Sequence, residues 1–295
     1  MPVGPWAQDK LDCLGQYLSA YTTILRKRKF EGYFYIDAFA GPGSLKIRKQ
    51  EEHSTAQQLL LDMAEYAVDD EEEATYLAGS PRVALEIKHR FTDYVFVERD
   101  PMRIQQLEEL KGEFSSDRTR IHIRQQDCNT YLDGLVRRVN TRWRQWRGVV
   151  FLDPFGMQVP WATIAALGAT GAIEVLLNFP VGMAIQRLLK RSGRFSPKEK
   201  AKLDGYFGTN SWFDLLYEHS DDLLGGQIVK VRRSGDVLVS WYRKRLEQAF
   251  GFVTEAREVK NTAGKPLYYL IWAGPNKVGA GIAEYVLGRD ARTVR

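Results

Sequence analysis

Short runs of apolar, β-branched and aromatic residues alternate along the chain with longer segments whose apolar residues recur at helical spacing. The strand-like runs lie at 33–37, 94–98, 121–124, 148–153 and 172–178. Continuous apolar runs of this length are typical of parallel strands covered on both faces. Their alternation with amphipathic helical segments predicts an α/β fold with a doubly wound, mostly parallel sheet.

The tail of the chain has a different pattern. Residues 252–259 and 267–272 have the composition of two strands, and turn-forming residues join them. We therefore expect a Rossmann-like, seven-stranded, mostly parallel sheet with one antiparallel edge and helices on both faces. The prediction is a single domain over 1–295, with insertions at about 45–78 and 181–233, the second of them helical.

Composition narrows the class of protein. Hydrophobic residues make up 44% of the chain, which is enough for a packed core. Only Cys13 and Cys128 are cysteines, there are four histidines and no CxxC, so we expect no metal site and a reducing, cytoplasmic location. No apolar run approaches the roughly 18 residues of a membrane span, and the first residues lack the pattern of a secretory signal.

Charge leaves the class of partner open. The formal net charge is +5 and the pI is about 9.0, which permits a polyanionic partner without requiring one. Basic residues gather at 26–29, 118–124, 137–147 and 187–202. Each cluster taken alone is typical of solvated helix ends and loops.

A carboxylate or an amide follows each of the five predicted parallel strands. These residues are Asp37, Glu98, Asp127, Asp153 and Asn178. In open α/β sheets ligands bind at the carboxyl ends of the strands, so we expect these side chains to surround one site.

The first predicted strand ends in the turn Asp37-Ala-Phe-Ala-Gly-Pro-Gly43. Gly41 and Gly43 would let the backbone approach a ligand closely. Glu98 could accept hydrogen bonds from both ribose hydroxyls, Asp127 from an adenine amino group, and Asp37 from an ammonium, directly or through water. These partners together describe S-adenosylmethionine (SAM). The predicted cofactor-binding residues are Asp37, Phe39, Ala40, Gly41, Gly43, Glu98, Asp127 and Cys128.

A dinucleotide site is the competing interpretation of the same turn. It requires G-x-G-x-x-G/A opening directly into a helix whose N-terminus holds the pyrophosphate. Here Lys46 stands at the third position after Gly43, and no clear helix begins there. A phosphate cradle favours an anion, and the sulfonium of SAM is a cation. The sequence therefore favours SAM over NAD.

The residues after the fourth strand, Asp153-Pro-Phe-Gly156, resemble the Asp/Asn-Pro-Pro-aromatic tetrapeptide of methyltransferases that modify amino groups of nucleobases. In that tetrapeptide a carboxylate or amide and a backbone carbonyl hold the amine, and the aromatic ring stacks on the base. The second proline is replaced here by Phe155, and Gly156 takes the place of the aromatic residue. By this resemblance the predicted catalytic residues are Asp153, Pro154 and Phe155, with core packing as the alternative role for Phe155.

The ordered set of motifs is similar to the three-Cys-motif partner (TcmP) family over nearly the whole chain. The matching features are Trp6…Lys10-Leu11…Tyr17-Leu18, the turn 37–43, Gly79-Ser-Pro81 with Ala84-Leu85, Val97-Glu-Arg-Asp100, Phe151-Leu-Asp-Pro-Phe-Gly156, Leu177-Asn-Phe-Pro180 and Leu267-Tyr-Tyr-Leu-Ile271. The resemblance implies a Rossmann-like class I methyltransferase fold and a neighbouring three-cysteine protein as a partner. The insertion at 45–78 departs from the family's compact pattern.

Three functions remain open at this stage. The chain could methylate an amino group of a nucleic-acid base, with DNA or RNA as its partner. It could be a SAM-dependent methyltransferase of a protein or a small molecule. It could also be a non-catalytic, partner-binding module on the same fold.

Overall fold

The structure is a computed structural model that describes residues 5–43, 79–114, 119–138, 143–220, 227–260 and 264–288. The predicted insertion at 45–78 lies outside the described residues.

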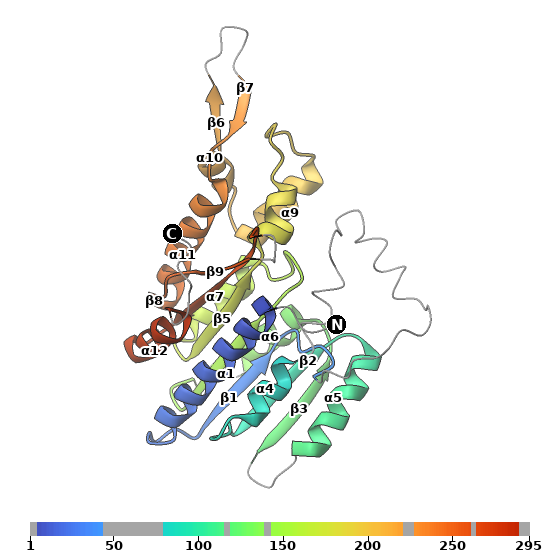
Figure 1. The fold of residues 1–295 in the computed structure, drawn as a ribbon, viewed down its shortest axis with the longest axis vertical. Coiled ribbons are helices and arrows are strands. Elements are labelled where there is room, and N and C mark those ends of the chain that lie inside the picture. The colour runs from blue at the N-terminus through green and yellow to red at the C-terminus, as the bar shows by residue number, and fades with distance from the viewer. Residues whose placement is uncertain are drawn as a thin grey trace.

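Within these ranges the main sheet has eight strands in the order β3-β2-β1-β4-β5-β10-β8, with β9 also paired to β10 (Figure 1). The strands are β1 (Gly32–Asp37), β2 (Asp93–Glu98), β3 (Arg120–Gln125), β4 (Trp146–Leu152), β5 (Ile173–Phe179), β8 (Phe252–Val253), β9 (Arg257–Lys260) and β10 (Pro266–Gly274). Strands β1 to β5 pair in parallel, and β10 runs antiparallel to β5. From β1 the chain proceeds outward to β2 and β3 and then returns to β4, so the sheet changes direction between β1 and β4.

The five parallel strands and the antiparallel edge confirm the predicted fold class, but the predicted count of seven strands is wrong. The segment expected as one strand, 252–259, forms β8 and β9, separated at Thr254. There the Thr254 N–H donates to the Trp272 carbonyl at 3.1 Å, and the Trp272 N–H donates to Thr254 Oγ1 at 3.3 Å. A side-chain oxygen thus takes the place of a ladder carbonyl and interrupts the strand.

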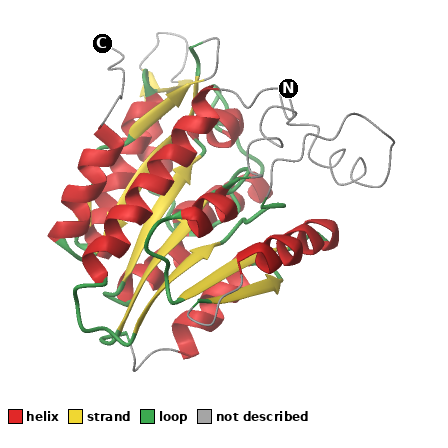
Figure 2. Cartoon of the chain, turned by 60° about the horizontal axis from the view of Figure 1, so that its bottom comes forward, coloured by secondary structure: helices red, strands yellow, loops and turns green. Residues whose placement is uncertain are grey.

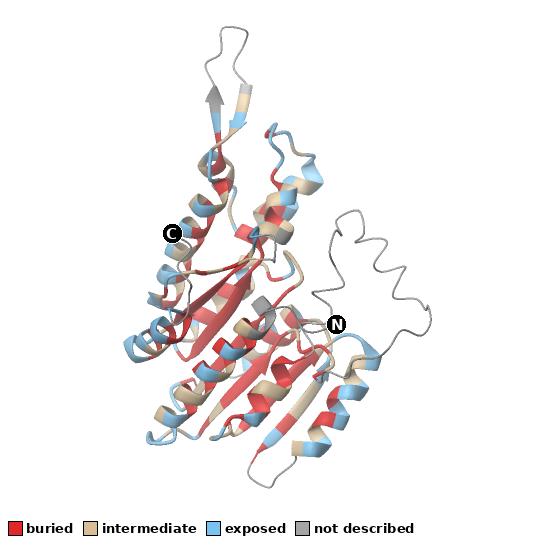
Figure 3. Ribbon diagram, in the orientation of Figure 1, coloured by how far each residue is buried: buried red, intermediate tan, exposed pale blue. Residues whose placement is uncertain are grey.

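Helices cover both faces of the sheet, as Figure 2 shows. One face carries α1 (Pro5–Leu25), α4 (Ser80–Glu86), α5 (Pro101–Phe114) and α12 (Lys277–Gly288), and the other carries α6 (Cys128–Arg138), α7 (Trp161–Ala169) and α11 (Ser234–Phe250). Successive strand residues serve opposite faces: Tyr35 packs under α1 and α4, and Ile36 packs on the other side. The central strands are accordingly buried along almost their whole length (Figure 3).

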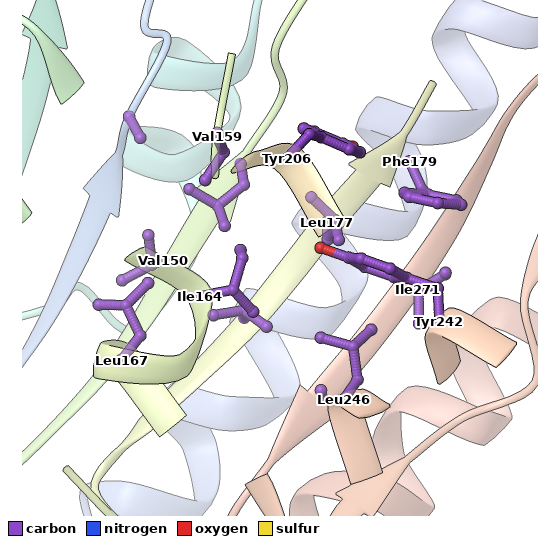
Figure 4. Close-up of a cluster of buried hydrophobic side chains, with 14 of the residues drawn as sticks. Val150, Val159, Ile164, Leu167, Leu177, Phe179, Tyr206, Tyr242, Leu246 and Ile271 are labelled. Atoms are coloured by element: carbon purple, nitrogen blue, oxygen red, sulfur yellow. The ribbon is translucent and has the colours of Figure 1, made fainter. Parts of the chain in front are cut away.

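The second face is held by aromatic stacking at its centre (Figure 4). Phe179 at the end of β5 stacks on Tyr242 of α11 with ring centroids 4.3 Å apart, and Tyr206 continues the stack. Leu177, Ile164 and other branched residues fill the space below. This packing fixes the end of β5, from which the next segment of the chain departs.

The region after β5 differs from its prediction. Residues 181–233 contain the expected helices, but they also contain an antiparallel hairpin. The elements are the π-helix η1 (Val181–Ile185), α8 (Gln186–Leu188), α9 (Pro197–Phe207), α10 (Trp212–Leu216), β6 (Tyr217–Ser220) and β7 (Gln227–Lys230). Tyr217 leaves the helical region with φ −132° and ψ 137°, which starts the hairpin. In Figure 1 the hairpin and α9 extend beyond the main sheet, and we call residues 186–220 and 227–233 the arm.

Candidate functional site

A buried ion pair lies where β4 ends. The Lys10 ammonium of α1 donates to Asp153 Oδ2 at 2.5 Å, and both side chains are almost fully buried. The Asn178 amide donates to the other carboxylate oxygen, Oδ1, at 2.7 Å. The rings of Phe151 and Tyr268 flank the ammonium at 5.8 and 5.2 Å. Asp153 is therefore held from both sides by residues of α1 and β5.

Asp37, at the end of β1, is a second buried carboxyl at this edge. It is completely buried, and it accepts weak hydrogen bonds of 3.3 Å from the Tyr35 hydroxyl and the Phe39 N–H. The pKa of Asp37 is raised to about 7, mainly by burial; the Ser80 hydroxyl opposes the shift, and the nearby Asp153 adds to it. Asp37 can therefore change its protonation state near neutral pH.

Ser80 is not the N-cap of α4. Gly79 is the N-cap of α4, and Ser80 is the first helical residue, followed by Pro81. The Ser80 hydroxyl is buried on the side of Asp37 and lies close enough to lower that carboxyl's pKa, yet it makes no hydrogen bond of standard geometry. Asn178 Oδ1 is likewise a buried acceptor without a partner among the described residues. Two underused polar atoms thus lie at this edge of the sheet.

The backbone N–H groups of residues 38–41, in the turn after β1, are already hydrogen-bonded within the protein. The N–H groups of Ala38 and Ala40 donate to the carbonyls of Phe151 and Val97 at 3.1 and 3.0 Å. The N–H groups of Phe39 and Gly41 donate to the carboxylates of Asp37 and Glu98. Four consecutive donors are consumed inside the protein. A phosphate cradle needs such donors unoccupied, so the N–H groups of residues 38–41 do not form one.

Glu98 joins two turns at the carboxyl edge. Its Oε2 accepts from Gly41 N at 3.0 Å, and its Oε1 accepts from Arg99 N and Asp100 N at 2.6 and 3.0 Å. Arg103 of α5 lies 3.7 Å from Oε2. The Glu98 side chain is only 11% exposed, and Oε2, which accepts one hydrogen bond, retains a lone pair for a further donor.

Asp127 has a structural task besides the predicted one. Its Oδ1 accepts from the N–H groups of Asn129 and Thr130 at 2.9 and 3.1 Å, which caps α6. Asp127 is half-buried, and Oδ2 is not part of the cap. The next residue, Cys128, is buried in the core, and burial raises the pKa of its thiol to about 12.

Three predicted loop residues belong mainly to the packing of the fold. Ala40 is buried beneath α1 and α4, and Phe39 packs against the opposite core. Gly43 adopts φ +71°, and a Cβ there would lie 2.7 Å from a methyl group of Leu110 in α5. The close approach that needs this glycine is therefore to a helix of the protein itself.

The residues of the turn after β4 that were predicted to be catalytic differ in exposure. Pro154 is buried, and Phe155 is half-exposed and belongs to neither hydrophobic core cluster. The Phe155 N–H donates to the Gln158 side chain at 2.9 Å, which stiffens the turn. Of the two roles considered for Phe155, the structure disfavours core packing.

Lys10 and Ser80 were not predicted as members of the site from their chemistry. The signal for Lys10 was present, since a lysine lies on the apolar stripe that α1 presents to the sheet, beside Leu11, Leu14 and Leu18. A buried lysine requires a carboxylate partner, and the partner was identifiable only once β4 was placed beneath α1.

Among the residues that the structure describes, no group of three or more His, Cys, Asp or Glu side chains could hold a metal ion. No helix in the described ranges is long and apolar enough to cross a membrane.

Comparisons with known proteins find only distant similarity to solved structures. No protein-family model matches the chain, and no curated protein matches it. A solved structure of protein LPL1258 from Legionella pneumophila is similar with a TM-score of 0.40 at 15% identity, over 90% of this chain and 97% of that one. The Escherichia coli protein yhhF, described as a candidate methyltransferase, is similar with a TM-score of 0.29 at 12% identity, over 88% of this chain and 86% of that one. The strand order and the antiparallel β10 make this a Rossmann-like fold of the methyltransferase type.

Proposed function

We propose that the chain is a SAM-dependent methyltransferase whose cofactor lies at the carboxyl edge between β1 and β4. The observation that carries the proposal is the turn Asp37–Gly41, whose N–H groups are hydrogen-bonded within the protein and which lies beside the carboxyl groups of Asp37 and Glu98. A cationic amino-acid tail and a sulfonium suit such a surface, and a pyrophosphate does not.

The donor set fits the chemical groups of SAM. Asp37 is a carboxyl that can ionise near neutral pH and pair with an ammonium. Glu98 at the end of β2 keeps acceptor capacity for a ribose hydroxyl, and Asp127 at the end of β3 keeps Oδ2 for an amino group. The unpartnered Ser80 hydroxyl beside Asp37 is the kind of buried polar atom that a polar ligand would satisfy.

When bound, SAM supplies a methyl group on a positively charged sulfur, ready for in-line displacement. This chain's residues would position the acceptor and exclude water. Lys10 and Asn178 hold the Asp153 carboxylate in one orientation. Asp153 would in turn orient an acceptor amine, and the half-exposed Phe155 ring would cover the acceptor's flat face.

An amino group of a nucleobase is the acceptor that this arrangement supports best. A carboxylate followed by proline and an accessible aromatic ring can bind the amine and stack on the ring that bears it. We also infer membership of the three-Cys-motif partner family from the motifs in the sequence. Co-purification with a three-cysteine partner chain would support that inference.

Calorimetry with SAM, and with NAD as the control, tests the cofactor. We expect SAM to bind in the micromolar range. NAD should give no heat, because the turn has no free backbone N–H groups at residues 38–41 to bind a pyrophosphate. Glu98→Gln should weaken SAM about 10-fold, since it replaces a charged acceptor by a neutral one. Equal binding of NAD and SAM would overturn the assignment.

Transfer of a labelled methyl group from SAM tests the reaction. Label is expected in nucleic acid rather than in protein when the enzyme is added to whole-cell extract. Label that persists in a nuclease-treated extract would favour a protein or small-molecule acceptor. Tight SAM binding without any transfer would favour a non-catalytic module.

A further inference from the structure

The net positive charge of the chain is concentrated in one short stretch of the arm. Residues 187–202 contain seven lysines and arginines and a single acid, Glu199. This stretch therefore carries +6, whereas the whole chain carries +5, so all other residues together are close to neutral. The concentration points to a local surface with its own role rather than to general solubility.

Most of these cations have no carboxylate to balance them. Glu199 pairs with Lys190 at 2.7 Å and also caps α9 through Ser196. Within the described residues, no carboxylate is in ion-pair range of Arg191, Arg194, Lys198 or Lys202, and all four are exposed. Like charges so arranged repel each other, so they do not serve the stability of the arm.

The arm presents these charges on a fixed scaffold. Phe195, between Arg194 and α9, packs edge-on against Trp212 at 5.3 Å, and the Tyr217 hydroxyl donates to the Lys190 carbonyl at 2.8 Å. Gly193, with φ +63°, lies so close to the hairpin that a Cβ would be 2.5 Å from a methyl group of Ile228. The loop that bears Arg191 and Arg194 is thereby pinned to the hairpin.

The hairpin adds a further cation to this loop. Lys230 of β7 donates to the Gln186 side chain at 2.6 Å and to the Leu189 carbonyl at 3.0 Å; burial, with a smaller contribution from Arg191, lowers its pKa to about 8. Lys230 thus joins strand β7 to the loop that bears Arg191.

This surface starts next to the candidate site. The arm leaves the sheet through η1, immediately after β5, and Asn178 near the end of β5 holds Asp153. A polymer that lies on the arm would pass the carboxyl edge at which the acceptor is expected.

The exposed residues of the arm favour a nucleic acid over a membrane. Peripheral membrane binding requires large apolar side chains beside the basic ones. In the described part of the arm, Val229 is the only strongly exposed large apolar residue, at 42%. The aromatic residues Trp212 and Tyr217 are buried inside the arm and offer nothing to a bilayer.

We propose that the arm binds the phosphate backbone of a nucleic acid and presents one of its bases to the carboxyl edge of the sheet. Residues Arg191, Arg194, Lys198 and Lys202 contact phosphates, so binding depends on charge rather than on sequence. The proposal rests on the proposed methyltransferase function for the purpose of the contact, but the binding itself is independent of it.

Fluorescence anisotropy with labelled oligonucleotides of about 25 nucleotides tests the binding, with single-stranded RNA, single-stranded DNA and duplex DNA as separate probes. The test variant replaces Arg191, Arg194, Lys198 and Lys202 by Gln. The matched control replaces Lys27, Arg28, Lys29 and Lys88 by Gln, which removes the same formal charge from exposed positions at the opposite edge of the sheet.

We expect the arm variant to lose affinity by about 30-fold or more at about 50 mM salt and to lower the slope of log K against log salt by about 3. The control should lose less than about 3-fold. Equal losses in both variants, no measurable binding by the wild type, or tighter binding to anionic vesicles than to any oligonucleotide would overturn the proposal.

SAM calorimetry on the arm variant separates the two proposals, because intact SAM binding with lost oligonucleotide binding concerns the arm alone. Absent SAM binding in the wild type contradicts the proposed function and leaves the oligonucleotide result to decide the arm.

Discussion

The sheet buries carboxyl groups at both of its ends, and the partners of these groups differ between the two ends. At the carboxyl edge, Asp153 is paired with the Lys10 ammonium, and Asp37 lies nearby. At the amino edge, Glu174 of β5 is completely buried and receives hydrogen bonds from neutral donors, the Tyr17 hydroxyl and the Asn276 amide. Burial raises the pKa of Glu174 to about 7, as it does that of Asp37.

Helix α1 closes both ends of the sheet. Lys10 and Tyr17 are seven residues apart, which is about two turns and about 10 Å along the helix. The Trp272 indole donates to the Tyr17 hydroxyl at 2.6 Å, so the donors at the amino edge form a closed chain that ends on Glu174. This arrangement locks α1 to β5 and β10.

Buried polar atoms without a partner occur at both ends of the sheet. Among the described residues they are Ser80 Oγ, Asn178 Oδ1 and Tyr21 Oη. The first two belong to the carboxyl edge, and Tyr21 lies near Glu174, although both oxygens of Glu174 are satisfied. A raised pKa is therefore no sign of function by itself, since burial raises the pKa of Glu174 as it does that of Asp37.

The largest expected effect is on stability, at the ion pair. Asp153→Ala should lower the free energy of unfolding by about 3 to 5 kcal/mol, because it leaves the Lys10 ammonium buried without a counter-charge. The double variant Lys10→Met with Asp153→Ala should lose less than Asp153→Ala alone. Urea unfolding of wild type, both single variants and the double variant measures the coupling. Additive losses would show that the pair has no special role in the fold.

The next effect concerns the amino edge and its pH dependence. Because the folded-state pKa of Glu174 is raised to about 7, the folded protein binds more protons than the unfolded chain between about pH 4.5 and pH 7. The stability from this group is complete below that window and is lost as the pH rises through about 7. Glu174→Gln should therefore reduce the loss of stability between pH 5 and pH 8 by about 3 kcal/mol.

Thermal and urea unfolding at pH 5 and pH 8 measure the difference. The control is Asp133→Asn, which removes an exposed carboxylate paired with Arg137 on α6 and should change the pH dependence by less than about 0.5 kcal/mol. If Glu174→Gln follows the wild-type pH dependence, the carboxyl is not protonated in the folded state, and the comparison of the two edges loses its basis.

The third effect tests whether Asp37 and Glu174, the two carboxyl groups with raised pKa values, differ in ligand binding. Asp37→Asn should weaken SAM about 10- to 100-fold, the value of one hydrogen-bonded charge pair. Glu174→Gln should leave SAM affinity within about 2-fold, since it lies at the other edge. Calorimetry on both variants makes the comparison. Equal losses would show that burial near the sheet, and not position at the carboxyl edge, determines ligand binding.

The titration of Asp37 also predicts how binding depends on pH. Since its pKa is about 7 without ligand and a cationic ligand favours the ionised form, SAM affinity should rise between pH 6 and pH 8. Protons should be released on binding, which calorimetry in buffers of different ionisation enthalpy detects. In Asp37→Asn this pH dependence should disappear.

The parallel strands were predictable because their side chains are apolar on both faces and each ends in a polar turn. Their placement made the carboxyl-edge residues predictable too: Asp37, Glu98 and Asp153 all follow strands near the switch between β1 and β4. The break at Thr254 was not predictable, because a side-chain hydroxyl there competes with the ladder only once β10 is alongside. The β6–β7 hairpin was missed for a similar reason, since its four-residue strands carry no clear alternation.

The contacts between side chains of different helices and strands were the part of the site that the sequence could not predict. The pairing of Lys10 with Asp153 spans 143 residues of sequence, and the Tyr17–Glu174 contact spans 157. Neither spacing carries a local signal, so the sequence could identify which residues were unusual but not what they meet.

The smallest effect concerns two glycines, one near each edge. A Cβ at Gly43 would lie 2.7 Å from Leu110 in a backbone with φ +71°, and a Cβ at Gly279 would lie 2.7 Å from the Glu174 carboxylate. Gly43→Ala and Gly279→Ala should each cost about 1 to 2 kcal/mol of stability through crowding, and at Gly43 also through strain. Neither should change SAM affinity by more than about 2-fold, because the Gly43 contact is with α5. A large loss of SAM affinity in Gly43→Ala, at unchanged fold by circular dichroism, would return Gly43 to the ligand site and make the whole turn 37–43 a cofactor loop.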